Sequence, residues 1–252
     1  MEVHVFEETD STNNVLKKMT GEPAEYIAAV TSKQTAGRGR KGHSFVSPKG
    51  GLYLSLLYHP KEDSDEAVYL SRTTLAAAVS TVEAIELTFG IRTEIKWVND
   101  IYCNGKKAGG ILCEAPRNID GSLAGIIIGI GINCGSYDLP DELKDTACTL
   151  GIEDPDLETL TANILNRLVY WIHHLKDPVL LNKYRSKSFL LGKKVSFVQN
   201  GIRYEGVAED INEDGNLVVA GSEDAGMVLN SGEVSLSSWS DVEDHENLGR
   251  RR

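Results

Sequence analysis

Residues 96–114 read KWVNDIYCNGKKAGGILCE and give the clearest folding signal in the chain. The pair Asn104-Gly105 is a preferred two-residue β-hairpin turn, because both positions tolerate positive φ. A second turn over residues 118–121 leads into SLAGIIIGIGIN, residues 122–133. Since connections this short join antiparallel neighbours, these segments predict consecutive antiparallel strands.

Strand and helix patterns on either side extend this sheet. Strand-like segments precede it at residues 3–7, 26–31 and 51–58. An amphipathic helix is expected around Leu75, Ala78, Val79, Val82 and Ile85, ending near Gly90. A second helix is expected from about Leu157 to Leu175. The sequence therefore predicts an α+β fold, in which a mixed, mainly antiparallel sheet carries helices on one face.

After Gly192 the pattern changes to short strands separated by glycine turns. Segments such as GKKVSFVQ and GNLVVAG predict a small barrel of about five strands. The last residues have no apolar period, so a disordered tail is expected. We predict a large first domain over residues 1–190, a barrel over 191–238 and a disordered tail over 239–252.

Composition and charge narrow the class of protein. The chain has 252 residues, of which 41% are apolar and 25% charged, as in ordinary globular proteins. Its net charge of −11 argues against a general nucleic-acid binder. The N-terminus has no apolar segment of the signal-peptide kind, and no run is long enough to span a bilayer. Four cysteines without a C-x-x-C pair suggest free thiols, so a cytoplasmic protein is expected.

The loop TAGRGRKGHSF, residues 35–45, alternates glycines with basic residues. Glycine lets the backbone approach a ligand closely, and the basic side chains offer donors for phosphate or carboxylate oxygens. A solvated loop or a nucleic-acid tail would have the same composition, although the negative net charge weighs against nucleic acid. The spacing is not that of a phosphate-binding P-loop.

The strand after the hairpin carries a lysine. Strict alternation places four residues on one face: Lys107, Gly109, Ile111 and Cys113. An ammonium group inside a sheet is costly unless it meets an anion, and a strand glycine often marks close ligand approach. The alternative is an edge-strand lysine that prevents aggregation. Asn99 and Asp100, before the hairpin, suit either a divalent metal or a turn cap.

The segment GIGIN, residues 129–133, has glycines on one strand face and isoleucines on the other. Gly129 and Gly131 would leave a shallow floor for a flat ligand. The alternative is a tight packing site for a helix.

Together with TDSTN at residues 9–13, these motifs resemble the catalytic domain of biotin–protein ligases. The resemblance covers nearly the whole chain and finishes with SGEVSLS in the barrel. It implies a class II synthetase-like catalytic domain and an SH3-like C-terminal barrel. It also implies the short form of the enzyme, because DSTN begins at residue 10 and leaves no room for a DNA-binding domain.

The resemblance also implies a reaction. Biotin would be activated by ATP and Mg²⁺ to biotinyl-5′-AMP and transferred to a lysine of a biotin carboxyl carrier protein. Neither DNA nor a membrane would be a partner, and a homodimer is possible. The rivals are a lipoate–protein ligase, whose R-R-x-x-G-G-G signature is missing, and a nucleic-acid-binding module that uses the arginine loop and the barrel.

The family's functional residues map onto this chain as follows. The implied biotin-binding residues are Ser11, Thr12, Asn13, Gln34, Arg38, Gly39, Arg40, Lys107, Gly109, Gly129 and Gly131. Those implied for ATP or the adenylate are Arg38, Arg40, Phe45, Asn99, Lys107 and Asn133. Lys107 and Arg40 would be catalytic, and Asp100 would bind magnesium. The chain departs from the usual motifs at His43, Phe45 and Val98, which stand for arginine, tryptophan and proline.

Overall fold

The computed structural model describes residues 1–60, 66–199, 201–221, 226–230, 232 and 234–236. The chain forms two compact units, Met1–Phe189 and Leu190–Arg252. The predicted disordered tail, residues 239–252, lies outside the described residues. Within the described part, no helix is both long and apolar enough to cross a membrane.

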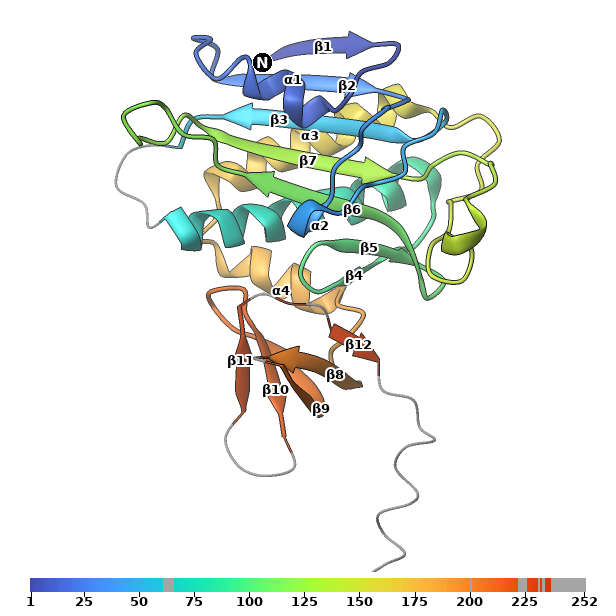
Figure 1. The fold of residues 1–252 in the computed structure, drawn as a ribbon, viewed down its shortest axis with the longest axis vertical. Coiled ribbons are helices and arrows are strands. Elements are labelled where there is room, and N and C mark those ends of the chain that lie inside the picture. Colours follow the sequence, from blue (N-terminus) through green and yellow to red (C-terminus); the bar gives the residue numbers. More distant parts are fainter. Residues whose placement is uncertain (61–65, 200, 222–225, 231, 233, 237–252) are drawn as a thin grey trace, which may run out of the picture. The chain divides into compact units, whose positions relative to one another are not determined.

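The first unit is built on a seven-stranded sheet (Figure 1). Its strands are β1 (Glu2–Phe6), β2 (Tyr26–Thr31), β3 (Leu52–Tyr58), β4 (Glu94–Lys96), β5 (Asp100–Cys103), β6 (Lys106–Glu114) and β7 (Ile126–Ile132). The spatial order is β1-β2-β3-β7-β6-β5-β4. Only the β1–β2 pair among these is parallel. The predicted mixed, mainly antiparallel sheet is therefore confirmed.

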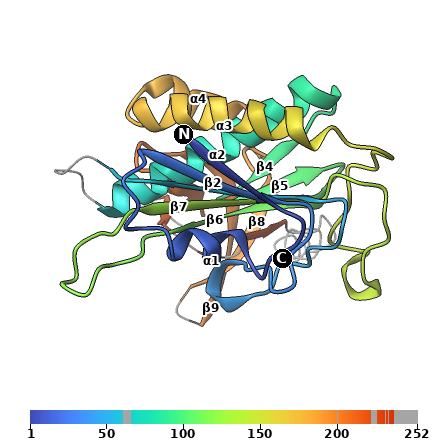
Figure 2. The same cartoon turned by 90° about the horizontal axis from the view of Figure 1, so that it is seen from above.

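Three helices cover one face of this sheet, as Figure 2 shows. They are α2 (Glu66–Phe89), α3 (Leu157–His173) and α4 (Pro178–Ser186). Helix α2 ends at Phe89, and the following Gly90 adopts φ +68°. Asp156 and Asp177 cap α3 and α4 by accepting backbone N–H groups. The predicted buried stripe of α2, formed by Leu75, Ala78, Val79, Val82 and Ile85, is buried throughout.

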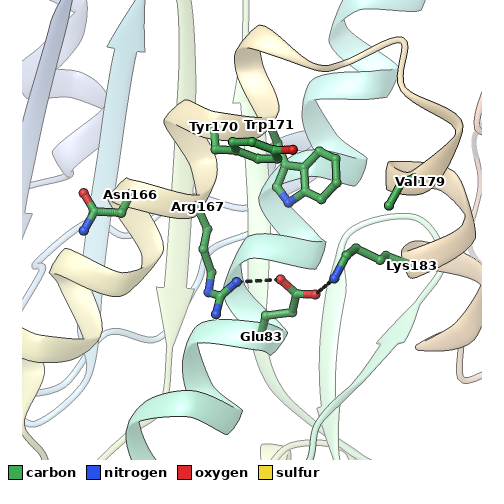
Figure 3. A pocket seen from close by; sticks show the side chains of 7 residues that line it. All are labelled: Glu83, Asn166, Arg167, Tyr170, Trp171, Val179 and Lys183. Carbon is green, nitrogen blue, oxygen red and sulfur yellow. Dashed lines mark hydrogen bonds and ion pairs between the residues drawn. The ribbon is translucent and has the colours of Figure 1, made fainter.

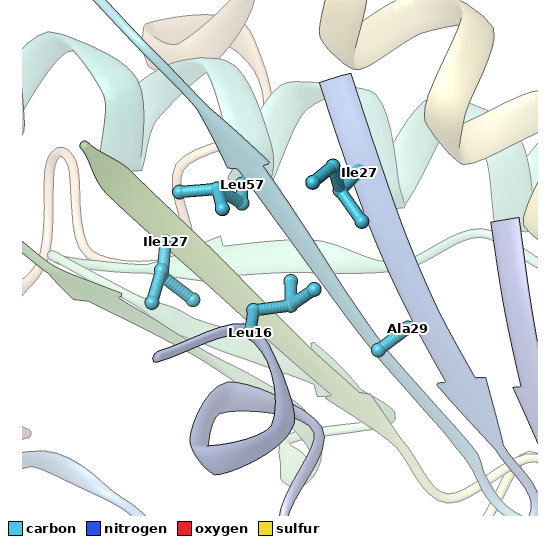
Figure 4. Close-up of a cluster of buried hydrophobic side chains, with 5 residues drawn as sticks. All are labelled: Leu16, Ile27, Ala29, Leu57 and Ile127. Atoms are coloured by element: carbon cyan, nitrogen blue, oxygen red, sulfur yellow. The ribbon is translucent and has the colours of Figure 1, made fainter. Parts of the chain in front are cut away.

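A short helix, α1 (Thr12–Lys17), lies on the opposite face of the sheet (Figure 2). Its Leu16 packs into a buried apolar cluster with Ile27, Ala29, Leu57 and Ile127 from β2, β3 and β7 (Figure 4). This packing holds α1 against strands β2, β3 and β7. The prediction of helices on one face therefore holds for the three longer helices and not for α1.

The second unit is one antiparallel sheet of five strands in the order β11-β10-β9-β8-β12. They are β8 (Lys194–Gln199), β9 (Ile202–Ile211), β10 (Leu217–Ala220), β11 (Met227–Leu229) and β12 (Val234–Leu236). Its core includes Val195, Phe197, Ala208, Leu217 and Val219, which alternate with more exposed neighbours. The prediction of about five short strands after Gly192 is confirmed, and this second sheet is consistent with the predicted SH3-like barrel.

Candidate active site

The start of α1 brings together four of the residues predicted to bind biotin. Ser11, Thr12 and Asn13 are each only 3% exposed. The Thr12 N–H donates to Gln34 Oε1 at 2.9 Å, and Ser55 Oγ lies 2.6 Å from both Thr12 Oγ1 and Asn13 Oδ1. Buried polar groups of this kind are preorganised for hydrogen bonding. The sequence analysis did not single out Ser55, although it is the one serine in the otherwise mainly apolar segment LYLSLLY of β3.

A patch without side chains lies beside this polar cluster. Gly110 of β6 pairs directly with Gly131 of β7. A Cβ on Gly129 would lie 2.3 Å from Asn13 Oδ1, and one on Gly131 would lie 2.8 Å from the Phe45 ring. These three glycines, here called the glycine floor, therefore face α1 and the arginine loop. The predicted ligand floor at Gly129 and Gly131 lies on the same face as the polar cluster.

The prediction that Lys107 shares a face with Gly109 is wrong. The β5–β6 register pairs Tyr102 with Lys107 but Ile101 with Gly109, so Ala108 is an extra residue in β6. A β-bulge of this kind shifts the alternation by one residue. Lys107 consequently points to the face of Gly110, where a Cβ would lie 3.6 Å from the lysine Nζ. A Cβ on Gly109 would instead meet the Gly131 carbonyl at 2.6 Å, so Gly109 permits close strand packing.

The segment Asn99-Asp100 holds the two predicted catalytic cations. Lys107 Nζ lies 2.7 Å from Asp100 Oδ1. Arg40 Nη1 donates to Asn99 Oδ1 at 3.0 Å, and the Asn99 amide in turn donates to the Ile111 carbonyl at 2.9 Å. Both cations are thus positioned by neighbouring residues of the same turn. The structure brings Arg40, Asn99, Asp100 and Lys107 together as the sequence motifs predicted.

Asp100 is the residue expected to bind magnesium. Magnesium is usually held by one or two carboxylates together with substrate phosphates and water. The Asp100 carboxylate is engaged by the Lys107 ammonium, and within the described residues no three His, Cys, Asp or Glu side chains gather as metal ligands. The residues present therefore fit a magnesium ion only if substrate phosphates supply most of its ligands.

Helix α4 stabilises the turn that precedes Asp100, through a hydrogen bond from Tyr184. The fully buried Tyr184 hydroxyl donates to the Val98 carbonyl at 3.0 Å. Burial raises the pKa of Tyr184 far above its ordinary value, and the negative charge of Asp100 adds to this effect. The hydroxyl therefore stays protonated and serves as a permanent donor to the residue before Asn99.

We expect Tyr184→Phe to lower the free energy of unfolding by about 1–3 kcal/mol, because the buried Val98 carbonyl loses its donor. The activation of biotin by ATP, which the sequence resemblance implies, should also slow, since the turn that holds Arg40 and Lys107 is loosened. Urea denaturation and steady-state rates would measure both effects. Tyr170→Phe is the matched control, because Tyr170 is 52% exposed on the helical face. Equal stability of the two variants would contradict the proposed support.

A carboxylate that the sequence analysis did not single out lies at the other end of the glycine floor. Glu114, the last residue of β6, binds Lys17 Nζ at 2.8 Å, Asn13 Nδ2 at 2.8 Å and Arg38 Nη1 at 3.2 Å. Burial acts to raise the pKa of Glu114, but the bonds from Lys17 and Asn13 and the charges of Lys17 and Arg38 lower it more. The pKa therefore lies below its ordinary value, and Glu114 is charged at neutral pH.

The remaining predicted residues lie around these groups. Phe45 stands over Gly131 and packs edge-on against Tyr53, with ring centroids 6.4 Å apart. The Gly39 N–H donates to the His43 carbonyl inside the arginine loop at 2.7 Å. Asn133 is 4% exposed. Its amide nitrogen donates to the Cys148 carbonyl, and its amide oxygen accepts from the Tyr137 hydroxyl. The Asn133 side chain thus stabilises a neighbouring loop, and the contacts of its amide do not include the two cations.

A separate hollow lies among the helices on the opposite face of the sheet (Figure 3). Its central carboxylate, Glu83, is ion-paired with both Arg167 and Lys183. Tyr170, Trp171, Asn166 and Val179 complete the lining. None of the predicted site residues lies there, so the functional site is assigned to the face that carries α1.

The comparisons with known proteins agree with this assignment. Residues 5–133 match the biotin/lipoate A/B protein ligase family, and residues 190–237 match the biotin protein ligase C-terminal domain. The bifunctional ligase/repressor BirA of Bacillus spizizenii is 48% identical over 129 residues, which make up 50% of this chain and 38% of that relative. The biotin–[acetyl-CoA-carboxylase] ligase of Mycobacterium tuberculosis is 26% identical over 92% of this chain and 88% of its own length.

A solved structure extends the similarity over almost the entire chain. The biotin protein ligase of Aquifex aeolicus, in complex with biotin and ATP, superimposes with a TM-score of 0.79 and 31% identity. The match covers 94% of this chain and 98% of that one. By contrast, the matched region spans less than half the length of the Bacillus relative. Motif order, fold and these matches together show that the chain belongs to the biotin/lipoate A/B protein ligase family and carries a biotin protein ligase C-terminal domain.

Proposed function

We propose that this protein is a biotin–protein ligase, which activates biotin with ATP and transfers it to a lysine of a biotin carboxyl carrier protein. The observation that carries the proposal is the placement of Lys107 and Arg40 beside the glycine floor, each oriented by the Asn99-Asp100 turn. The names of the Mycobacterium and Aquifex relatives support biotin as the acid and ATP as its activator.

In the first step the biotin carboxylate attacks the α-phosphate of ATP, giving biotinyl-5′-AMP and pyrophosphate. Two anions must approach each other, so positive charge has to be in place beforehand. Lys107 and Arg40 would supply that charge at the edge of the glycine floor. Magnesium bound to the phosphates would neutralise further charge, and Asp100 would supply a carboxylate ligand to it.

The polar cluster at α1 would bind the other end of biotin. A ureido ring carries both N–H donors and a carbonyl acceptor. The Thr12, Asn13 and Ser55 side chains provide buried groups of both kinds next to Gly129. A site built from buried hydrogen-bonding groups rejects analogues that lack the matching groups, because its own groups are then left unpaired. This cluster would therefore favour biotin over lipoate, which has no ureido ring.

In the second step the carrier lysine amine attacks the mixed anhydride and AMP leaves. No covalent intermediate on the enzyme is required. Burial raises the pKa of the Cys113 thiol to about 11 and that of Cys134 to about 12, so neither is a ready nucleophile. The arginine loop would shield the anhydride from water between the two steps.

We further propose how the enzyme is organised into domains, how it associates and where in the cell it works. Residues 1–190 would form the catalytic domain, and residues 191–238 would form an SH3-like barrel. The exposed edge strand β1, where Val3 is 49% and Val5 77% exposed, would pair with a second copy in a homodimer. Four free cysteines and the use of ATP support a cytoplasmic location.

The overall reaction is tested by intact-mass analysis of a biotin carboxyl carrier domain incubated with the protein, ATP and biotin. We expect the mass to rise by one biotinyl group. A carrier whose acceptor lysine is replaced by arginine should stay unmodified. Modification by lipoate under the same conditions, or no modification by either acid, would overturn the proposal.

A further inference from the structure

We propose that Glu114 is a positioning residue that ties the arginine loop to the sheet. This inference rests on the proposed function, because the arginine loop, residues 35–45, is taken to cover the activated acid. The carboxylate would act through Arg38 and Asn13 and would take no part in the chemistry itself.

The geometry joins Glu114 to both halves of the site. Arg38 Nη1 lies 3.2 Å from one carboxylate oxygen of Glu114 and 3.3 Å from the other. The Asn13 amide donates to the same carboxylate at 2.8 Å, while its oxygen lies 2.6 Å from Ser55 Oγ. One side chain thus fixes the position of a loop arginine and the orientation of an amide in the polar cluster.

The Glu114 side chain is more buried than that of its partner Arg38, so the carboxylate is held more firmly than the loop arginine. The Glu114 side chain is 19% exposed, whereas that of Arg38 is 40% exposed. Lys17 also binds the carboxylate, at 2.8 Å. Two cations therefore share one negative charge, and the cluster keeps a surplus positive charge. Arg38 can remain tied to Glu114 and still attract an anionic substrate.

The backbone of the loop tip is bonded mainly within the loop. The Gly39 N–H donates to the His43 carbonyl, and the Phe45 N–H donates to the Gly37 carbonyl. Arg38 and Arg40 reach from this tip to the sheet face, the first to Glu114 and the second to Asn99. Arg38 also donates to Asn14 Oδ1 of α1 at 3.2 Å. Loss of the Glu114 charge should therefore loosen the tip on the side of α1, while Arg40 keeps its own contact with Asn99.

Glu114→Gln is the direct test, because it keeps the size of the side chain and an acceptor for Asn13 but removes the charge. Trypsin cleaves after arginine and lysine, so the loop offers three sites: Arg38, Arg40 and Lys41. We expect cleavage in the loop to be about threefold to tenfold faster than in the wild type, as mapped by mass spectrometry without ligands. Saturating biotin and ATP should protect both proteins.

The kinetic readout separates positioning from catalysis. Ordering the freed loop would draw on substrate binding energy, so the KM for biotin should rise about threefold to tenfold with little change in kcat. Glu86→Gln is the matched control, since it removes an ion pair with Lys187 on the helical face. This control should match the wild type in loop cleavage and in KM.

Two outcomes would overturn the proposal. One is wild-type loop cleavage in a folded Glu114→Gln protein, and the other is a loss of kcat with unchanged KM. If Glu114→Gln does not fold, Arg38→Ala removes the same tie from its exposed side and should also speed cleavage. Because cleavage without ligands needs no enzymatic activity, its result stands even if the protein proves not to be a ligase.

Discussion

Lys107→Ala is expected to slow formation of biotinyl-5′-AMP by about 10²–10³-fold while biotin binding changes much less. The Lys107 ammonium is held by Asp100 at 2.7 Å on the face of the glycine floor. There it would stabilise charge that develops only as the carboxylate and the α-phosphate meet. Single-turnover formation of the adenylate gives the rate, and calorimetry gives the affinity for biotin.

Lys106→Ala is the control for this experiment. Lys106 is the preceding residue of β6, but its ammonium donates to the Lys144 carbonyl. We expect near-normal adenylate formation in this variant. A near-normal rate in Lys107→Ala as well would mean that Lys107 serves only as the ion-pair partner of Asp100. The edge-strand alternative is wrong, because β6 lies between β7 and β5.

Gly129→Ala should weaken biotin binding by about 5- to 150-fold, which corresponds to roughly 1–3 kcal/mol for one buried polar group left without its partner. The added methyl group would lie 2.3 Å from Asn13 Oδ1. Asn13 would have to move, and with it the bonds to Ser55 and Glu114. Titration calorimetry with biotin measures the loss directly.

Gly21→Ala provides the comparison, because a Cβ on Gly21 meets nothing within 4 Å. This variant should bind biotin as the wild type does. Thermal unfolding of both variants separates a local change from loss of the fold. If Gly129→Ala binds biotin normally, the polar cluster is not the biotin site, and the glycine floor serves only to pack α1.

Much of the sheet and of the site was readable from local sequence. The Asn104-Gly105 turn and the apolar runs determine neighbouring strands, and these signals depend only on residues close together in the chain. The motif residues Arg40, Asn99, Asp100 and Lys107 were predicted and do lie together. Their clustering follows from two antiparallel strands and one loop that crosses them.

The sheet face on which the Lys107 side chain lies could not be predicted. The prediction relied on strict strand alternation, which assumes that no residue is inserted into the strand. The bulge at Ala108 depends on how β5 and β6 pair. It moves Lys107 from the face of Gly109 to that of Gly110. The error reversed which glycine belongs to the ligand face, although the lysine itself was correctly chosen.

Glu114 and Ser55 were missed for a different reason. Both residues bond Asn13 of α1, which is 101 residues from Glu114 and 42 residues from Ser55 in sequence. No local pattern reports such contacts. Helix α1 has six residues, which is too short for apolar spacing to show which face of the sheet it covers.

Exchange of labelled pyrophosphate into ATP is the most direct test that this face of the sheet activates biotin. The exchange reports reversible adenylate formation and requires no carrier protein. We predict exchange that depends on biotin, is not supported by lipoate, and is largely lost in Lys107→Ala. Exchange that proceeds without biotin, or that survives unchanged in Lys107→Ala, would contradict the assignment of the active site to the glycine floor and its two cations.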